Sequence, residues 1–223
     1  MDRDFEQTWQ AIAAQRLALA AELDRLTDDE WHTPSLCDGW TVRDVAAHLT
    51  LQELDLRTAL TDFVRHPAGL NRAIRDAARR RAQRPTGELV AMVRASAGSR
   101  RHNVGVTPRQ TLIDALVHSQ DITVPLGRPL PMPAGAAAEA ATAVWDRGWP
   151  WHARRRFAGF RLRATDTDWS AGDGTPLEGP IDAILMLLTG RPAALSVARD
   201  EACLSRPSDP RRSGSAGSSA PPA

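Results

Sequence analysis

The sequence predicts a mainly α-helical fold: a bundle of four main helices with one extra helix, followed by a small α+β unit. Apolar residues recur at helical spacing through the first two thirds of the 223-residue chain. Alternating apolar and polar residues, which are typical of a strand, begin only after Gly159. A chain of this length can also bury a sizeable core without the help of disulfides.

The first two helices are predicted from their apolar spacing and from one start signal. The first covers about residues 4–26. The second begins at Thr41, because Thr41 is a good N-cap and Asp44 follows three residues later as the acid of a capping box. We expect it to run to about Val64. The expected core stripe of the first helix consists of Phe5, Trp9, Ile12, Leu17, Leu19 and Leu23.

The third bundle helix follows an arginine-rich segment, residues 70–84, which we expect to be a polar helix or a loop. Thr86 is expected to cap this third helix, which then reaches about Arg101. The extra helix is rich in alanine and is expected over residues 134–149, after a linker that contains three prolines.

The fourth bundle helix has the clearest start in the sequence. Thr107 is the predicted N-cap, Pro108 occupies the first helical position, and Gln110 completes a capping box. Gly127 is a natural C-terminal residue for a helix that ends near Leu126.

The C-terminal unit is predicted to combine strands with one helix. Residues 160–165 alternate as a strand does, Asp173-Gly174 supplies a turn, and residues 176–178 can form a short return strand. An apolar helix is expected over residues 180–189, and Gly190 is expected to end it.

We therefore divide the chain into a helical bundle at 1–157, an α+β unit at 158–205 and a disordered tail at 206–223, which has no apolar content to bury.

The 28 basic and 27 acidic residues give a net charge of +1, which argues against nucleic acid as a partner. No apolar run approaches the ~20 residues that cross a bilayer. Because Cys37 and Cys203 lie far apart, we expect a reducing compartment, the cytoplasm.

A set of polar side chains on the second and fourth helices can meet inside the bundle. Asp114 and His118 are spaced i, i+4, Asp121 falls within the same arc, and His48 shares a helix face with Asp55. Two imidazoles and one carboxylate are a reasonable ligand set for zinc. On spacing alone, however, a simpler interpretation is favoured: a core histidine that bonds to a nearby carbonyl or carboxylate, and a helix-surface hydrogen bond between Asp114 and His118.

Three segments carry a resemblance to a known family: LCDGWTVRDVAAHL at 36–49, DALVHSQDITVPLG at 114–127, and the stretch from LRATDTDWS to MLLTGR at 162–191. Together they resemble the mycothiol-dependent maleylpyruvate isomerase family, whose N-terminal domain is a DinB-like helical bundle. In that family, a histidine on the second helix and an acid-x-x-x-His pair on a later helix hold the metal. The matching positions are His48, Asp114 and His118, although the characterised isomerases have glutamate where this chain has Asp114.

The resemblance implies a thiol-dependent enzyme with one divalent metal, preferably zinc, and mycothiol as cosubstrate. The open metal position would receive the sulfur, and the metal's charge would deprotonate it. Addition to a cis alkene, rotation and elimination would give an isomerase, whereas a transferase would stop at the adduct. The C-terminal part is shorter than in the full-length isomerase, so the small-molecule substrate and the reaction stay open.

Four more residues are weaker candidates for the site. Asp121 and Asp55 would orient the histidines, or else form ordinary salt bridges with arginines. Arg109 and Arg191 would pair with a substrate carboxylate, although Arg191 would also favour the last turn of its helix. Cys37 is expected to be a loop residue near the mouth of the pocket.

Two alternatives to an enzyme remain: a non-catalytic DinB-like metal or thiol sensor, and a metal-free helical scaffold.

Overall fold

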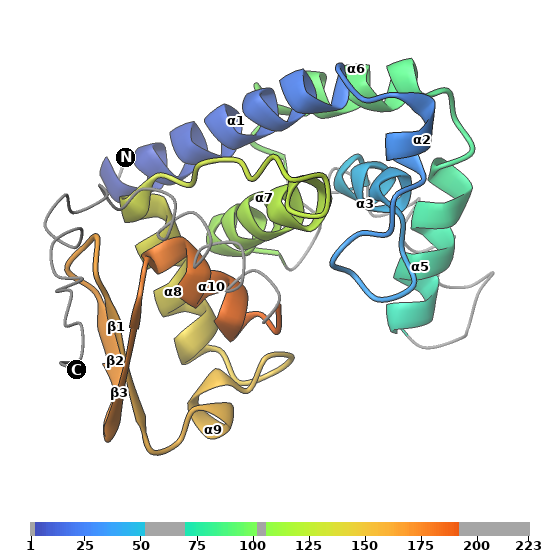
Figure 1. The fold of residues 1–223 in the computed structure, drawn as a ribbon. Coiled ribbons are helices and arrows are strands. Elements are labelled where there is room, and N and C mark those ends of the chain that lie inside the picture. Colours follow the sequence, from blue (N-terminus) through green and yellow to red (C-terminus); the bar gives the residue numbers. More distant parts are fainter. Residues whose placement is uncertain (1–2, 52–69, 102–105, 192–223) are drawn as a thin grey trace, which may run out of the picture.

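A computed structural model describes residues 3–51, 70–101 and 106–191 of the chain. The described part is mainly helical and carries one three-stranded sheet near its C-terminal end, as the sequence predicts (Figure 1). The helices are α1 (Arg3–Leu23), α2 (Asp28–Trp31), α3 (Val42–Leu49), α5 (Leu70–Arg81), α6 (Thr86–Ser96), α7 (Pro108–Thr123), α8 (Ala134–Asp146), α9 (Ala153–Arg156) and α10 (Ile181–Leu188). The strands are β1 (Phe160–Ala164), β2 (Ser170–Gly172) and β3 (Thr175–Gly179).

Helix α7 is the centre of the molecule. The long helix α1 packs along it, and α3 and α8 pack against it from other sides (Figure 1). Most of its side chains from Thr111 to Thr123 are therefore buried. One apolar cluster joins α1 and α7 to α8, α10 and β1, and a second joins α1 and α7 to α3 and α6. The predicted boundary at residue 157 falls within the first cluster, and the division into domains stays a prediction.

Two apolar positions of the predicted first-helix stripe do not belong to the core. Trp9, Ile12, Leu19 and Leu23 are buried as expected. Phe5 and Leu17 were expected with them but are 40% and 51% exposed. An amphipathic helix buries one face only, and Leu17 lies two residues from Leu19, on the opposite side of the helix.

The second predicted helix begins where the sequence predicts but ends earlier. Thr41 caps α3 and forms the predicted capping box with Asp44. The helix ends at Leu49 and a turn over Thr50 and Leu51 follows, so α3 does not continue without a break as predicted; the predicted stretch over 52–64 is outside the described residues. The hydroxyl of Thr50 donates to a carbonyl three residues back at 2.7 Å, and backbone bonds of the same short span close the last turn. Residues 52–69 lie outside the described part of the chain.

The arginine-rich segment after that gap forms the helix α5, which settles the choice between helix and loop. The predicted cap at Thr86 is wrong, because Pro85 is the N-cap of α6 and makes no side-chain hydrogen bond there. Helix α6 also ends at Ser96, five residues before the predicted end at Arg101. A turn that contains Gly98 follows it.

The start of α7 agrees with the prediction, whereas its end comes earlier. Thr107 accepts a hydrogen bond from the backbone of Gln110, whose side chain bonds back to the Thr107 amide. The helix ends at Thr123 rather than near Leu126, and a turn then leads to Gly127 at φ +68°. The extra helix α8 likewise stops three residues before its predicted end, because Arg147 is extended.

The small sheet has the strand order β2-β1-β3, which differs from the predicted hairpin. The predicted return strand is β3, but it runs parallel to β1, and the antiparallel partner is β2, which the sequence reading missed. The chain passes from one edge of β1 to the other within two residues. Gly172 and Gly174 permit this, since their φ values are +80° and +118° and a Cβ on either would collide with a backbone carbonyl.

The remaining predictions for the C-terminal unit concern one helix and the tail. Helix α10 ends as predicted ahead of Gly190, whose φ is +90°. The tail at 206–223 lies outside the described residues. None of the helices in the described ranges is both long and apolar enough to cross a membrane.

Candidate metal centre

His48, Asp114 and His118 meet between α3 and α7, as the sequence predicts. The Nε2 atom of His118 lies 3.0 Å from Asp114 Oδ1, and the Nε2 atom of His48 lies 3.7 Å from Asp114 Oδ2. The two imidazole rings are 5.0 Å apart between centroids and stand at 80° to each other. One possible ligand atom from each residue lies within 4.8 Å of the other two. We call these three residues the histidine triad.

Local sequence explains how the two helices present these side chains. The capping box fixes the start of α3, and Val45, Ala46 and Leu49 of that helix are buried in the core. His48 is left partly exposed beside α7, with the ring of Trp40 against it at 5.4 Å. On α7, Asp114 and His118 follow each other by one turn and therefore face the same space.

Asp121 lies one turn beyond His118 and is fully buried. One of its oxygens is 2.8 Å from His118 Nδ1, so this carboxylate holds the ring from the side away from Asp114. The guanidinium of Arg191 donates to both oxygens, at 3.0 and 2.8 Å, and the thiol of Cys37 donates to one of them at 3.0 Å. A buried charge needs this kind of compensation.

The electrostatics of the triad favour a positive charge at its centre. Burial raises the pKa of Asp114, but the imidazoles of His118 and His48 lower it by more, so that pKa lies far below its ordinary value. Burial lowers the pKa of His118, yet Asp114 and Asp121 outweigh this and leave it well above the ordinary value. The Asp114 carboxylate, which stabilises an imidazolium from the Nε2 side, would also stabilise a divalent cation there.

The pKa of Asp121 follows the same reasoning. Burial raises it, and the contacts with His118 and Arg191 lower it by more, so the carboxyl stays ionised. Since its oxygens accept bonds from both partners, the His118 ring is held with Nδ1 toward Asp121 and Nε2 toward Asp114. Histidines that bind a metal are usually oriented by such a carboxylate.

A second group of possible metal ligands shares His118 with the first. Cys37, His118 and Asp121 also bring one possible ligand atom each within 4.8 Å of one another. The guanidinium of Arg191 already bonds to both oxygens of Asp121 and lies 3.6 Å from the Cys37 sulfur. A cation there would face this positive charge at close range, so the histidine triad is the better metal site.

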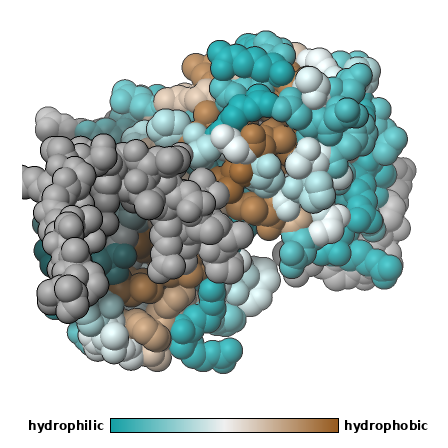
Figure 2. Space-filling model, viewed as in Figure 1, coloured by the Kyte–Doolittle hydropathy of each residue, from teal (hydrophilic) through white to brown (hydrophobic). Residues whose placement is uncertain are grey.

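The histidine triad opens onto a cavity of about 520 Å³. The segment before α3, helices α3, α5 and α7, and the residues after α10 form its walls, and the surface in Figure 2 is hollowed between the left and right parts of the molecule. The cavity leaves a metal accessible to a small ligand, as a catalytic site requires. Its lining residues are Leu36, Cys37, Asp38, Trp40, His48, Ile74, Arg75, Asp114, His118, Gly190 and Arg191.

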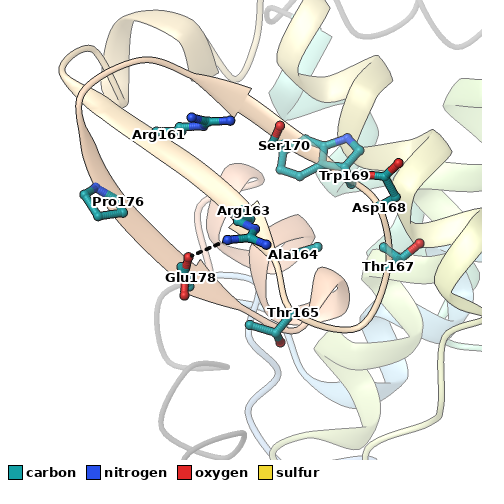
Figure 3. Close-up of a pocket in the computed structure, with 10 residues that line it drawn as sticks. All are labelled: Arg161, Arg163, Ala164, Thr165, Thr167, Asp168, Trp169, Ser170, Pro176 and Glu178. Atoms are coloured by element: carbon teal, nitrogen blue, oxygen red, sulfur yellow. Dashed lines mark ion pairs between the residues drawn. The ribbon is translucent and has the colours of Figure 1, made fainter.

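A larger hollow of about 690 Å³ lies over the exposed face of the sheet. Figure 3 shows Arg161 and Arg163 there, with the second arginine in an ion pair with Glu178 at 3.5 Å. Both partners of this pair are at least half exposed. No histidine or cysteine lines the hollow, so it offers no comparable ligand set.

The two arginines predicted to bind a substrate have other partners. Arg109 is 65% exposed, forms an ion pair with Glu139 at 3.2 Å and does not line the cavity. Arg191 does line it, but its guanidinium is bound to Asp121. Asp55 lies outside the described residues, so its predicted role stays a prediction.

Sequence reasoning missed two features of the site. Cys37 was expected in a loop near the pocket mouth, and it does line the cavity, but its bond to Asp121 has no signal in the sequence because 84 positions separate them. Ile74 and Arg75 of α5 also line the cavity. The sequence predicted only a polar helix or a loop for this segment and did not indicate whether it lies beside the site.

The donor set fits a metal through the Nε2 atoms that face Asp114. Two nitrogens and a carboxylate oxygen are the donors zinc prefers, and helical bundles build such sites from facing helices. The other nitrogen of His48, Nδ1, is buried and has no hydrogen-bond partner within the described ranges. Metal binding at Nε2 would leave this atom free to carry the ring proton.

Comparison with known proteins gives one family. The model of the mycothiol maleylpyruvate isomerase N-terminal domain matches residues 12–121, a segment that begins within α1 and ends within α7. All three residues of the histidine triad, together with Asp121, fall inside the matched segment. No curated protein and no solved structure matches the chain.

Proposed function

Because this chain belongs, through residues 12–121, to the family of mycothiol maleylpyruvate isomerase N-terminal domains, we propose that it is a metal-dependent enzyme that uses a low-molecular-weight thiol. Mycothiol is the proposed thiol, and a small electrophile is the proposed substrate. The reaction is an isomerisation or a transfer of the sulfur. The observation that carries the proposal is the convergence of His48, Asp114 and His118 at one cavity.

Each residue of the site has a role in this proposal. His48, Asp114 and His118 would hold one divalent metal, zinc by preference, and Asp121 would keep the His118 ring in place. When bound, the metal supplies the positive charge that lowers the pKa of a thiol. Arg191 neutralises Asp121 and so preserves the charge balance around His118. The cavity, at about 520 Å³, limits the substrate to a small molecule.

The proposal includes both an isomerase and a transferase because the two reactions begin with the same step. In both, the thiol adds to an electrophilic carbon, and only the later elimination distinguishes them.

We also propose that the protein works in the cytoplasm, where a reduced thiol pool is maintained. The alternative, a non-catalytic sensor of thiol or metal, needs the same triad but no turnover.

The first test is the metal content of the purified protein. We expect about one equivalent of zinc or a similar divalent metal per chain in the wild type. His48→Ala and His118→Ala should each lose it. His32→Ala is the matched control, because that histidine is exposed and hydrogen-bonded to a backbone carbonyl of its own helix. A wild-type protein that takes up no metal would overturn the proposal.

The second test separates the enzyme from the sensor. Calorimetry should show that mycothiol binds to the zinc-loaded protein and not to His118→Ala. Maleylpyruvate and a panel of electrophiles should then be converted in the presence of the thiol. Thiol binding without turnover of any of them would favour a thiol sensor. Absence of thiol binding would exclude the enzyme and the thiol sensor and leave only a sensor of metal.

A further inference from the structure

Helix α5 forms one wall of the cavity that contains the histidine triad. It packs against α3, and Figure 1 shows it at the edge of the molecule beside that helix. Two consecutive residues, Ile74 and Arg75, line the cavity from this wall. Ile74 is 38% exposed although it is a large hydrophobic residue, and Arg75 is exposed as well.

The charged side chains that line the cavity are not equally available to a ligand. Asp114 lies against the two imidazoles. Arg191 donates to both oxygens of Asp121 and, through its third nitrogen, to the carbonyl of Thr189 at 2.7 Å. Its guanidinium is therefore already committed to groups of the protein.

Arg75 differs from Arg191 in this respect. Across the described part of the chain, Arg75 forms no ion pair or hydrogen bond, and it does not pair with Asp38, the remaining acid of the cavity lining. An arginine on a cavity wall presents a planar fork of donors that matches a carboxylate. Its neighbour Ile74 adds apolar surface beside that fork.

We propose that Arg75 binds a carboxylate of the electrophile and so determines the preference of the site for anionic substrates. This inference rests on the proposed function and names the substrate class and the residue that recognises it. Arg191, in contrast, would keep its role as the partner of Asp121. The substrate would thus be a small carboxylate whose reactive carbon lies near the triad while Arg75 holds its charged end.

The test uses maleate as the probe, with its uncharged analogue dimethyl maleate, on the zinc-loaded full-length protein. Calorimetry should show that Arg75→Gln weakens maleate binding about tenfold or more, which is the usual effect of losing a charge-assisted pair. Binding of dimethyl maleate should not change. Where an anionic substrate turns over, KM should rise while kcat stays near the wild-type value.

Arg72→Gln is the matched control. Arg72 lies on the same helix, is exposed and carries the same charge, but it does not line the cavity. Maleate binding should stay near the wild-type value in this variant. An equal loss in Arg72→Gln and Arg75→Gln would indicate a general electrostatic effect and would overturn the inference. Failure of maleate to bind the zinc-loaded wild type would overturn it as well.

Metal content and mycothiol binding, measured on the same preparations, separate this inference from the proposed function. A wild type without metal or thiol binding overturns the proposed function and the inference with it. A wild type that binds metal, thiol and maleate, with unchanged maleate binding in Arg75→Gln, overturns the inference alone. Arg75→Gln that retains metal and thiol but loses maleate supports both.

Discussion

The carboxylate of Asp114 lies between two imidazoles, with one oxygen toward each ring. The resemblance drawn from the sequence leads us to expect a glutamate at this position, whose side chain would be one methylene longer. In this chain the 3.7 Å separation from His48 Nε2 exceeds a hydrogen bond, whereas the 3.0 Å separation from His118 does not. The shorter of the two contacts therefore joins Asp114 to His118, one turn along the same helix.

The first prediction concerns the charge of Asp114. Asp114→Asn keeps the shape of the side chain but removes the anionic ligand, so we expect zinc affinity to fall about 100-fold or more, a loss of roughly 3 kcal/mol. Competition with a chromophoric chelator measures this affinity. Asp38→Asn, an exposed acid of the same cavity, should leave it nearly unchanged. Equal affinities for the two variants would contradict the assignment of Asp114 as a ligand.

The second prediction concerns the buried ion pair of Asp121 and Arg191. Arg191→Met leaves a fully buried carboxylate without its cation, so we expect the free energy of unfolding to fall by about 3 kcal/mol. Urea denaturation measures the loss. Arg163→Met breaks an ion pair that is largely exposed and should cost less than about 1 kcal/mol.

The role of charge is separated from packing by a double variant. Asp121→Asn combined with Arg191→Met removes both charges and should recover part of the stability lost in Arg191→Met. A double variant as unstable as the sum of the two single changes would show that the pair acts by packing rather than by charge compensation.

At the scale of elements, the start of α7 is the best-defined helix end near the site. The hydroxyl of Thr107 accepts a bond from the amide of Gln110, and this cap fixes where the turn that carries Asp114 begins. The start of α6 is different, because Thr86 stands inside that helix and Pro85 precedes it without a side-chain bond.

The third prediction compares these two threonines. Thr107→Ala should lower the free energy of unfolding by about 1 kcal/mol, since an N-cap bond is lost. Thr86→Ala should change it by less than about 0.5 kcal/mol, because no cap bond is lost. Thermal or urea denaturation of both variants measures the two changes. Equal destabilisation would contradict the assignment of a stabilising cap bond to Thr107 and of none to Thr86.

The helix starts that could be predicted depend on contacts within four residues. The capping boxes at Thr41 and Thr107 are of this kind, so the sequence alone places both starts correctly. The helix end at Leu49 comes with a hydroxyl bond of Thr50 to a backbone carbonyl and a turn over Thr50 and Leu51, neither of which apolar spacing reveals. β3 is parallel to β1 because the chain crosses from β2, at one edge of β1, to the other edge. The turn signal at Asp173-Gly174 is the same for such a crossing and for a hairpin.

At the scale of the whole molecule, the site gathers side chains from distant parts of the chain. Asp114, His118 and Asp121 could be predicted as a group because one helix carries them at one-turn intervals. His48 was a candidate partner from the residues alone, but only the family resemblance favoured it over a simple core histidine, since an isolated histidine on a second helix has many possible neighbours. Arg191 and Arg75 reach the cavity through tertiary packing, and no local pattern indicates which arginines of this arginine-rich chain would do so.

The fourth prediction concerns the effect of the metal on the folded molecule. The histidine triad links α3 to α7, so a metal bound there stabilises the native state over the unfolded chain. At a free zinc concentration about 1,000-fold above Kd, linkage gives roughly 4 kcal/mol and a rise in Tm of about 10 °C. Differential scanning calorimetry with and without chelator measures it.

The variants of the triad provide the control for this measurement. In His48→Ala and His118→Ala, zinc should leave Tm nearly unchanged, whereas His32→Ala should respond as the wild type does. A wild-type Tm that does not respond to zinc would contradict metal binding to the native state. A response that persists in the triad variants would place the metal elsewhere.

The bond between Arg191 and Asp121 has a consequence for how the chain can be divided. The segment that matches the family ends at residue 121, yet the cation that neutralises this residue comes 70 positions later, after α10. A recombinant fragment cut at the end of the matched segment would expose an uncompensated carboxylate beside His118. The matched segment and residues 158–191 are therefore not interchangeable parts, and a chimera that replaces residues 158–191 must supply its own arginine at this point.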